Sequence, residues 1–93
     1  MKVDEAKLLV LDVIKSVLEN GKEVRLDMSL IGRDPLLDSM KLVEVCIALE
    51  DLADDRGFEF DWTSEAAMSK SRSIFKTIES LAVEFATQSG GTS

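Results

Sequence analysis

Residues 36–51 read LLDSMKLVEVCIALED and carry the strongest structural signal in the chain. Asp38 and Ser39 have short oxygen-bearing side chains, which make good N-caps because they accept hydrogen bonds from the unpaired amides of a first helical turn. Apolar residues then recur every three or four positions, which is the spacing of one buried helix face. This expected stripe comprises Leu42, Val43, Cys46, Leu49, Leu52 and Ala53. We therefore predict a helix from Asp38-Ser39 to about Asp55, ended by Gly57, since glycine adopts a left-handed C-cap conformation at little cost.

The same spacing occurs on both sides of this segment. It predicts a first helix from Val3 that Asn20-Gly21 stops, and a last helix that begins after a cap at Ser73. The apolar faces of these helices comprise Val3, Ala6, Leu9, Val10, Val13, Ile14 and Val17 in the first, and Ile74, Phe75, Ile78, Leu81, Ala82 and Phe85 in the last.

The link from about Lys22 to Leu37 is too apolar for a free linker, so we expect it to lie across the core, with a turn around residues 32–35. Its apolar residues are Leu26, Met28, Leu30, Ile31, Leu36 and Leu37.

Between Gly57 and the last helix, the alternation of Phe58, Phe60 and Trp62 with acidic residues allows a short extended piece. A brief helix over 65–68 follows, capped by the Thr63-Ser64 pair, and the polar run 69–73 is expected to be a loop.

These elements predict an all-α fold: a four-helix bundle with three longer helices and one short helix, and a long loop between the first two. We assign residues 1–87 to a single domain and 88–93 to a flexible C-terminal tail, because 93 residues suffice for one small core.

Composition argues against several function classes. The chain has 18 Asp and Glu against 11 Lys and Arg, a formal net charge of −7, so nucleic acid and anionic membranes would repel it while a basic partner surface would attract it. It has no histidine, which removes histidine-based triads and zinc motifs, so we expect no catalysis and no metal site. Cys46 is its single cysteine, so no intrachain disulfide forms. The N-terminal segment has the pattern of neither a signal peptide nor a membrane span, and we expect a cytoplasmic protein without membrane insertion.

Ser39 allows two interpretations. Asp-Ser is a common helix start, so the pair could serve only as a cap. Alternatively, a phosphodiester on a serine at this junction would lie beside free N–H groups and the positive end of the helix dipole. The LLDSM segment, the LVEVCIALED helix, the apolar link and the four-helix pattern together resemble acyl carrier proteins, nearly throughout the chain and most sharply from Leu36 to Asp51.

The resemblance implies that Ser39 receives 4′-phosphopantetheine from coenzyme A through a phosphopantetheinyl transferase. The thiol of that arm would carry an acyl or aminoacyl group as a thioester between enzymes of fatty acid or other lipid, polyketide or secondary-metabolite synthesis. Asp38 matches the acid before the modified serine, and Met40 matches the apolar residue that helps partner docking. The acids that meet basic partner surfaces correspond to Glu44, Glu50 and Asp51. Those partners include an acyl- or amino-acid-activating ligase and acyl-transfer enzymes.

The family also keeps an interior in which an acyl chain can hide. The expected walls of this cargo pocket are Leu42, Cys46, Ile47, Phe75 and Ile78. Cys46 itself is expected to be a small core residue rather than a reactive thiol. No further apolar helix face remains to be covered, so we expect a monomer.

Three departures favour a specialised carrier over the housekeeping fatty-acid carrier. Lys41 stands where many fatty-acid carriers have an acid, Pro35-Leu36-Leu37 replaces a glycine-containing lead-in, and residues 56–73 are longer than usual. The alternatives are a D-alanyl or other aminoacyl (peptidyl-type) carrier, and a non-carrier acidic helical adapter in which Asp38-Ser39 is only a cap.

Overall fold

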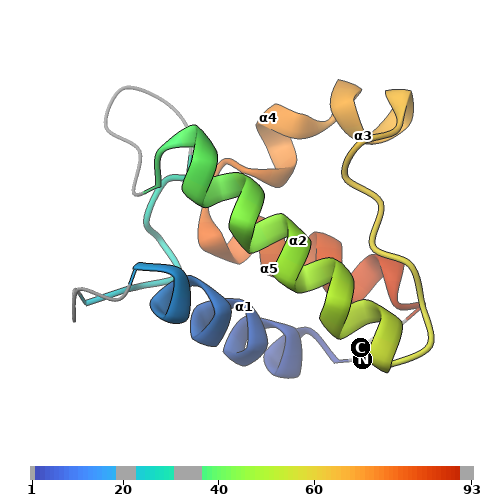
Figure 1. The fold of residues 1–93 in the computed structure, drawn as a ribbon, viewed down its shortest axis with the longest axis horizontal. Coiled ribbons are helices and arrows are strands. Elements are labelled where there is room, and N and C mark those ends of the chain that lie inside the picture. The colour runs from blue at the N-terminus through green and yellow to red at the C-terminus, as the bar shows by residue number, and fades with distance from the viewer. Residues whose placement is uncertain (1, 19–22, 31–36, 91–93) are drawn as a thin grey trace.

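The computed structural model describes residues 2–18, 23–30 and 37–90. Within these ranges the chain forms α1 (Val3–Leu18), α2 (Ser39–Asp55), α3 (Glu65–Ser69), α4 (Ser71–Ile74) and α5 (Ile78–Gln88), and no strand. Helix α1 packs against both α2 and α5, while the short helices α3 and α4 lie on the side of the molecule away from α1 (Figure 1). The predicted all-helical bundle is confirmed, with two short helices in place of the one expected.

Helix α2 has the predicted bounds, and both of its ends have identifiable causes. At its start, the Asp38 carboxylate accepts a hydrogen bond from the Lys41 amide at 2.8 Å. At its end, Gly57 has a φ of +85°, and the Phe58 amide donates to the Ala53 carbonyl oxygen at 3.0 Å. This is a Schellman C-cap, in which a glycine with positive φ lets the chain turn back on the last helical turn.

Helix α1 forms because its apolar residues fall on one face. Ala6, Val10 and Ile14 are fully buried, and the half-buried Val3, Leu9, Val13 and Val17 flank them. Ion pairs at the surface join this helix to its neighbours, from Lys7 to Glu79 of α5 at 3.4 Å and from Glu5 to Arg56 at 3.0 Å. The predicted stop at Asn20-Gly21 lies outside the described residues.

The link after α1 lies across the core as predicted. Leu30 and Leu37 are buried and Leu26 and Met28 are half-buried against the core; Ile31, Leu36 and the turn at 32–35 lie outside the described residues.

Its backbone also completes α5, because the carbonyl oxygens of Met28 and Leu26 accept hydrogen bonds from the Ile78 and Glu79 amides at 3.1 and 3.0 Å. These are first-turn amides, which have no acceptor inside their own helix.

The region before α5 differs from the prediction in two ways. Residues 71–73, expected to be a loop, form α4 together with Ile74, and the last helix begins at Ile78 rather than after Ser73. The break is caused by Thr77, whose backbone is extended, and whose side chain accepts from the Ser80 amide at 3.1 Å while Ser80 Oγ accepts from the Thr77 amide at 2.9 Å. Such a reciprocal capping box ends one helix and starts another, even though the apolar spacing continues through it.

The segment 58–62 crosses from α2 to α5 in an extended course without a strand, and it is fastened to α5 at two points. Phe58 and Phe60 each contact the buried Phe85 ring edge-on, with ring centroids 5.2 Å apart in both pairs. Gln88 accepts from the Asp61 amide at 2.5 Å and donates to the Asp61 carbonyl oxygen at 2.8 Å. Gln88, which the sequence assigned to the tail, is the last residue of α5. Its two hydrogen bonds hold the backbone of Asp61 against that helix.

Asp61 also supports the next helix. It accepts hydrogen bonds from the hydroxyl and the amide of Ser64, the residue that caps α3. These bonds, the hydroxyl bond foremost, lower the pKa of the Asp61 carboxyl. The predicted brief helix capped at 63–64 is thus confirmed, with Ser64 as the cap.

Candidate modification site and docking face on helix α2

Ser39 is the first residue of α2, and it is exposed to solvent. The preceding Asp38 is also exposed, and it supplies the side-chain cap of the helix. Because Asp38 performs the capping, the Ser39 hydroxyl is not needed to start the helix. This arrangement leaves the serine available for chemistry at the positive end of the α2 dipole.

A stripe of exposed apolar residues follows Ser39 along the same helix. Met40, Val43 and Ile47 are 76%, 42% and 50% exposed, and their spacing of three and four residues places them on one face. We call Met40, Val43 and Ile47 the α2 stripe. Large apolar side chains grouped in this way on a surface are typical of an interaction site.

One prediction fails at the α2 stripe, because Val43 was expected to be buried and is 42% exposed. Ile47, an expected pocket wall, is 50% exposed, and its role as a wall stays a prediction. The reason for both exposures is that α2 packs on the core through a different side of the helix. That side comprises Val45, Cys46, Leu49 and Ala53, all fully buried.

The acids predicted to bind partners lie beside the stripe, and all three are exposed. With the rotation of 3.6 residues per turn, Glu44 and Asp51 fall on one side of the stripe and Glu50 on the other. Glu50 accepts a hydrogen bond from the Trp62 indole N–H, so the 58–62 segment also contacts this face. Lys41 lies off the face: its ammonium donates to the Val17 carbonyl oxygen at 3.3 Å, near the end of α1.

Cys46 is the one described thiol, and it is fully buried and unpaired. Burial, assisted by the nearby charge of Glu50, raises the pKa of the Cys46 thiol to about 12. A thiol that stays protonated is a poor nucleophile, so the prediction of an inert core cysteine is confirmed.

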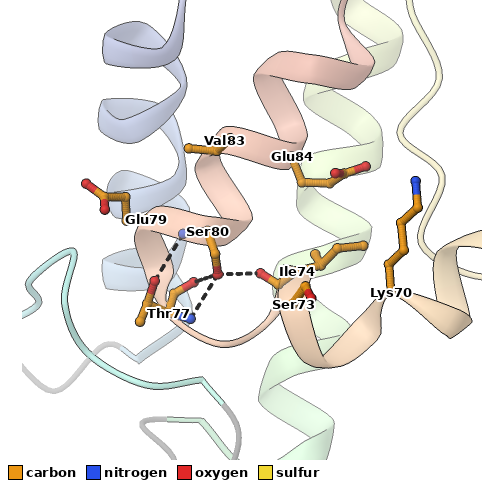
Figure 2. Close-up of a pocket in the computed structure, with 8 residues that line it drawn as sticks. All are labelled: Lys70, Ser73, Ile74, Thr77, Glu79, Ser80, Val83 and Glu84. Carbon is orange, nitrogen blue, oxygen red and sulfur yellow. Dashed lines mark hydrogen bonds between the residues drawn. The ribbon is translucent and has the colours of Figure 1, made fainter.

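The other expected pocket walls lie in the packed core or against it. Ile78 is fully buried, Phe75 is 7% exposed and Leu42 is half-buried, so these residues fill the core. A groove of about 490 Å³ lies instead between α4 and α5 (Figure 2), and none of the five predicted walls lines it. Its lining consists of Lys70, Ser73, Ile74, Thr77, Glu79, Ser80, Val83 and Glu84.

A second hollow, of about 660 Å³, lies between the C-terminal half of α2 and residues 57–60, and it is strongly acidic. It is lined by Glu50, Asp51, Asp54, Gly57, Phe58, Glu59 and Phe60. Across the described part of the chain, no group of three or more Asp, Glu, Cys or His side chains is arranged to hold a metal ion.

The sequence identified Ser39 as the modified residue and Met40 and the three acids as partner-binding residues, but it did not group Val43 and Ile47 with Met40. The available signal was the spacing of Met40, Val43 and Ile47, which repeats on the helix beside the buried stripe. None of the helices traced in the described ranges is both long and apolar enough to cross a bilayer. Comparisons with family models, with curated proteins and with solved structures gave no match to this chain.

Proposed function

We propose that this chain is an acyl carrier protein that bears 4′-phosphopantetheine on Ser39. The single observation that carries the proposal is the exposed Ser39 at the start of α2, followed on that helix by the exposed, acid-flanked α2 stripe. The proposal extends to a monomer that works in the cytoplasm with a phosphopantetheinyl transferase and a loading ligase.

The local geometry suits a phosphodiester at Ser39. The hydroxyl is on the first residue of a 17-residue helix, where the amides of the first turn point toward the loop. These amides and the helix dipole favour a negative charge. Asp38 holds the Lys41 amide, which keeps the first turn formed when the serine is modified.

The arm would supply a terminal thiol that holds the cargo as a thioester, and the chain itself would supply binding and orientation. Because Cys46 is buried with a raised pKa, it does not compete as a second acyl acceptor. The α2 stripe offers apolar contact to successive enzymes, while Glu44 and Asp51 favour partners with basic surfaces. Contacts of this kind give fast, salt-sensitive and weak association, which suits a shuttle that must leave each enzyme again.

The departures from the family pattern in the sequence favour a specialised carrier over the housekeeping fatty-acid carrier. The Lys41 position supports that choice, because Lys41 contacts both the Val17 carbonyl oxygen and, at 4.0 Å, the Glu44 carboxylate. A base therefore lies next to Glu44, on the side away from the α2 stripe. An aminoacyl carrier, such as a D-alanyl carrier, is accordingly kept beside an acyl carrier for lipid, polyketide or secondary-metabolite synthesis.

The test is to incubate the purified chain with coenzyme A, magnesium and a broad-specificity phosphopantetheinyl transferase, and to record the intact mass. We expect one phosphopantetheine increment on the wild type and none on Ser39→Ala. Ser73→Ala, which removes an exposed serine on α4, is the matched control and should be modified like the wild type. Ser39→Ala should stay folded because Asp38 supplies the cap.

A second pair of variants tests the docking face. Ile47→Glu, on a side chain that is 50% exposed, should slow the transferase reaction by about tenfold, the scale of one lost interface anchor. Val83→Glu changes a side chain of similar exposure, 42%, on α5 and should leave the rate near that of the wild type.

The non-carrier adapter remains the second candidate, and the α2 stripe is the observation that favours it, since docking does not need an arm. If several transferases leave the folded wild type unmodified, Ser39 is only the first residue of a helix and the adapter replaces the carrier.

A further inference from the structure

A second charged surface is formed around α4, opposite in sign to the acids Glu44, Glu50 and Asp51 that flank the α2 stripe, which we call the α2 face. Three bases, Lys70, Arg72 and Lys76, fall within seven residues, and no acid occurs between Glu65 and Glu79. All three side chains are exposed. We call Lys70, Arg72 and Lys76 the α4 basic face.

In the described part of the chain these three bases form no ion pair, a property they share with the isolated Lys2 and Lys15, but only the three lie together. Lys7 forms an ion pair with Glu79, and Arg56 forms one with Glu5. Two more bases form ion pairs with acids close to them in the sequence. Those two are Arg25, with Asp27, and Lys41, with Glu44. No such pair involves the α4 basic face, although the molecule has an excess of acids. In Figure 2, Lys70 and Glu84 stand on opposite sides of the groove between α4 and α5 without forming an ion pair.

The backbone beneath these side chains is fixed. Ile74 and Phe75 are only 4% and 7% exposed, so they anchor this segment in the core. The Ile74 carbonyl oxygen accepts a hydrogen bond from Ser80 Oγ at 2.8 Å, which joins the end of α4 to the first turn of α5 (Figure 2). Arg72 and Lys76 are both exposed, so they face away from the buried pair Ile74 and Phe75. The three charges therefore project from a supported surface rather than from a loose loop.

The distribution of charge indicates which anion this surface fits. The formal net charge of −7 repels an extended polyanion, such as nucleic acid or an anionic bilayer, which would also meet the acidic parts of the molecule. At physiological salt the field of a charge is screened within about 8 Å. A compact group of carboxylates on a protein would therefore meet the three bases while the acids of the α2 face remain screened from it.

We propose that the α4 basic face is a docking surface for an acidic segment of a partner protein. It is separate in sequence and opposite in charge to the α2 face, so a partner that engages both must carry basic and acidic surfaces. A binding surface with both signs of charge disfavours partners that are only basic, because such partners would match the acids near α2 but not the bases near α4. The proposal holds whether or not Ser39 carries an arm.

The test uses a synthetic peptide of six glutamates, titrated into the isotope-labelled chain and followed by amide chemical shifts. We expect the largest shifts at residues 69–77, present at about 0.01 M salt and absent at about 1 M, where the screening length is about 3 Å. Lys70→Gln/Arg72→Gln should weaken binding by about fivefold, the scale of two exposed charge contacts. Lys2→Gln/Lys15→Gln, which makes the same change in net charge at exposed bases on and next to α1, is the matched control and should bind like the wild type.

Equal weakening by both double variants, or shifts spread over all exposed bases, would show that only net charge matters and would overturn the proposal. Absence of binding at low salt would do the same, as would tighter binding to anionic vesicles or single-stranded DNA than to the peptide. Ser39→Ala should bind the peptide unchanged, so a failure of the carrier function is distinguishable from a failure of this docking surface.

Discussion

The outward direction of the α2 stripe can be tested by comparing two alanine substitutions on that helix. Leu49 is fully buried and Ile47 is 50% exposed, and both substitutions remove three carbon atoms. At about 0.8 kcal/mol per buried methylene, full burial of those atoms stabilises by about 2.4 kcal/mol. Leu49→Ala also leaves a cavity, so its expected cost is about 3–4 kcal/mol.

Ile47→Ala should cost much less. Half of the transfer term is about 1.2 kcal/mol, no cavity forms, and alanine gains about 0.4 kcal/mol in helix propensity over isoleucine. The expected net cost is below about 1 kcal/mol.

Urea unfolding followed by circular dichroism at a helical band measures both values. With a slope of about 1.5 kcal/mol per molar, Leu49→Ala should lower the midpoint by about 2–3 M and Ile47→Ala by less than about 0.7 M. Equal shifts for the two variants would mean that α2 packs on the core in another orientation, and the α2 stripe would no longer be a surface.

Three further outcomes follow from the described contacts. Thr77→Ala should lower the free energy of unfolding by about 1 kcal/mol, because it removes the cap of α5. Ser73→Ala should be nearly neutral in the same urea unfolding measurement. The reverse order would mean that the helix starts at Ser73. Gln88→Ala removes two hydrogen bonds to the Asp61 backbone, so about 1–2 kcal/mol of stability should be lost, with an increase in amide exchange across residues 58–62 that a merely frayed tail would not produce. Burial raises the Cys46 pKa from 9.0 to about 12, so the folded thiol stays protonated where the unfolded thiol ionises; stability present below pH 9 should therefore decline as pH rises from 9 toward 12, and iodoacetamide at pH 8 should label native protein only as fast as it unfolds. Rapid labelling of the folded protein would refute the burial of this thiol.

Local signals explain why the bounds of α2 were predictable. Asp38 and Gly57 act within one turn of the helix ends, through a side-chain cap and a positive φ, so the sequence alone contains what is needed. The position of Ser39 at the first helical residue follows from the same cap. Its exposure follows as well, because the N-terminal turn of a helix lies beyond the packed stripe.

The side of α2 that packs on the core was harder to predict from the sequence. Val43 is adjacent to Leu42 and lies on the edge between two apolar stripes, and only the contact with α1 decides which stripe is buried. The break at Thr77 was missed for a related reason. The apolar series of Ile74, Phe75 and Ile78 keeps helical spacing across the break, so periodicity indicates one continuous helix where the backbone forms two.

The carbonyl groups of Leu26 and Met28, which accept from the first amides of α5, couple two segments about fifty residues apart. First-turn amides of a helix ordinarily exchange with solvent deuterons quickly, because nothing protects them. Those of Ile78 and Glu79 should exchange slowly, at a rate set by detachment of the link rather than by fraying of α5. The Thr77 capping box that starts α5 is local, whereas these two contacts need a long loop to close, which assigns them to a late, non-local stage of folding.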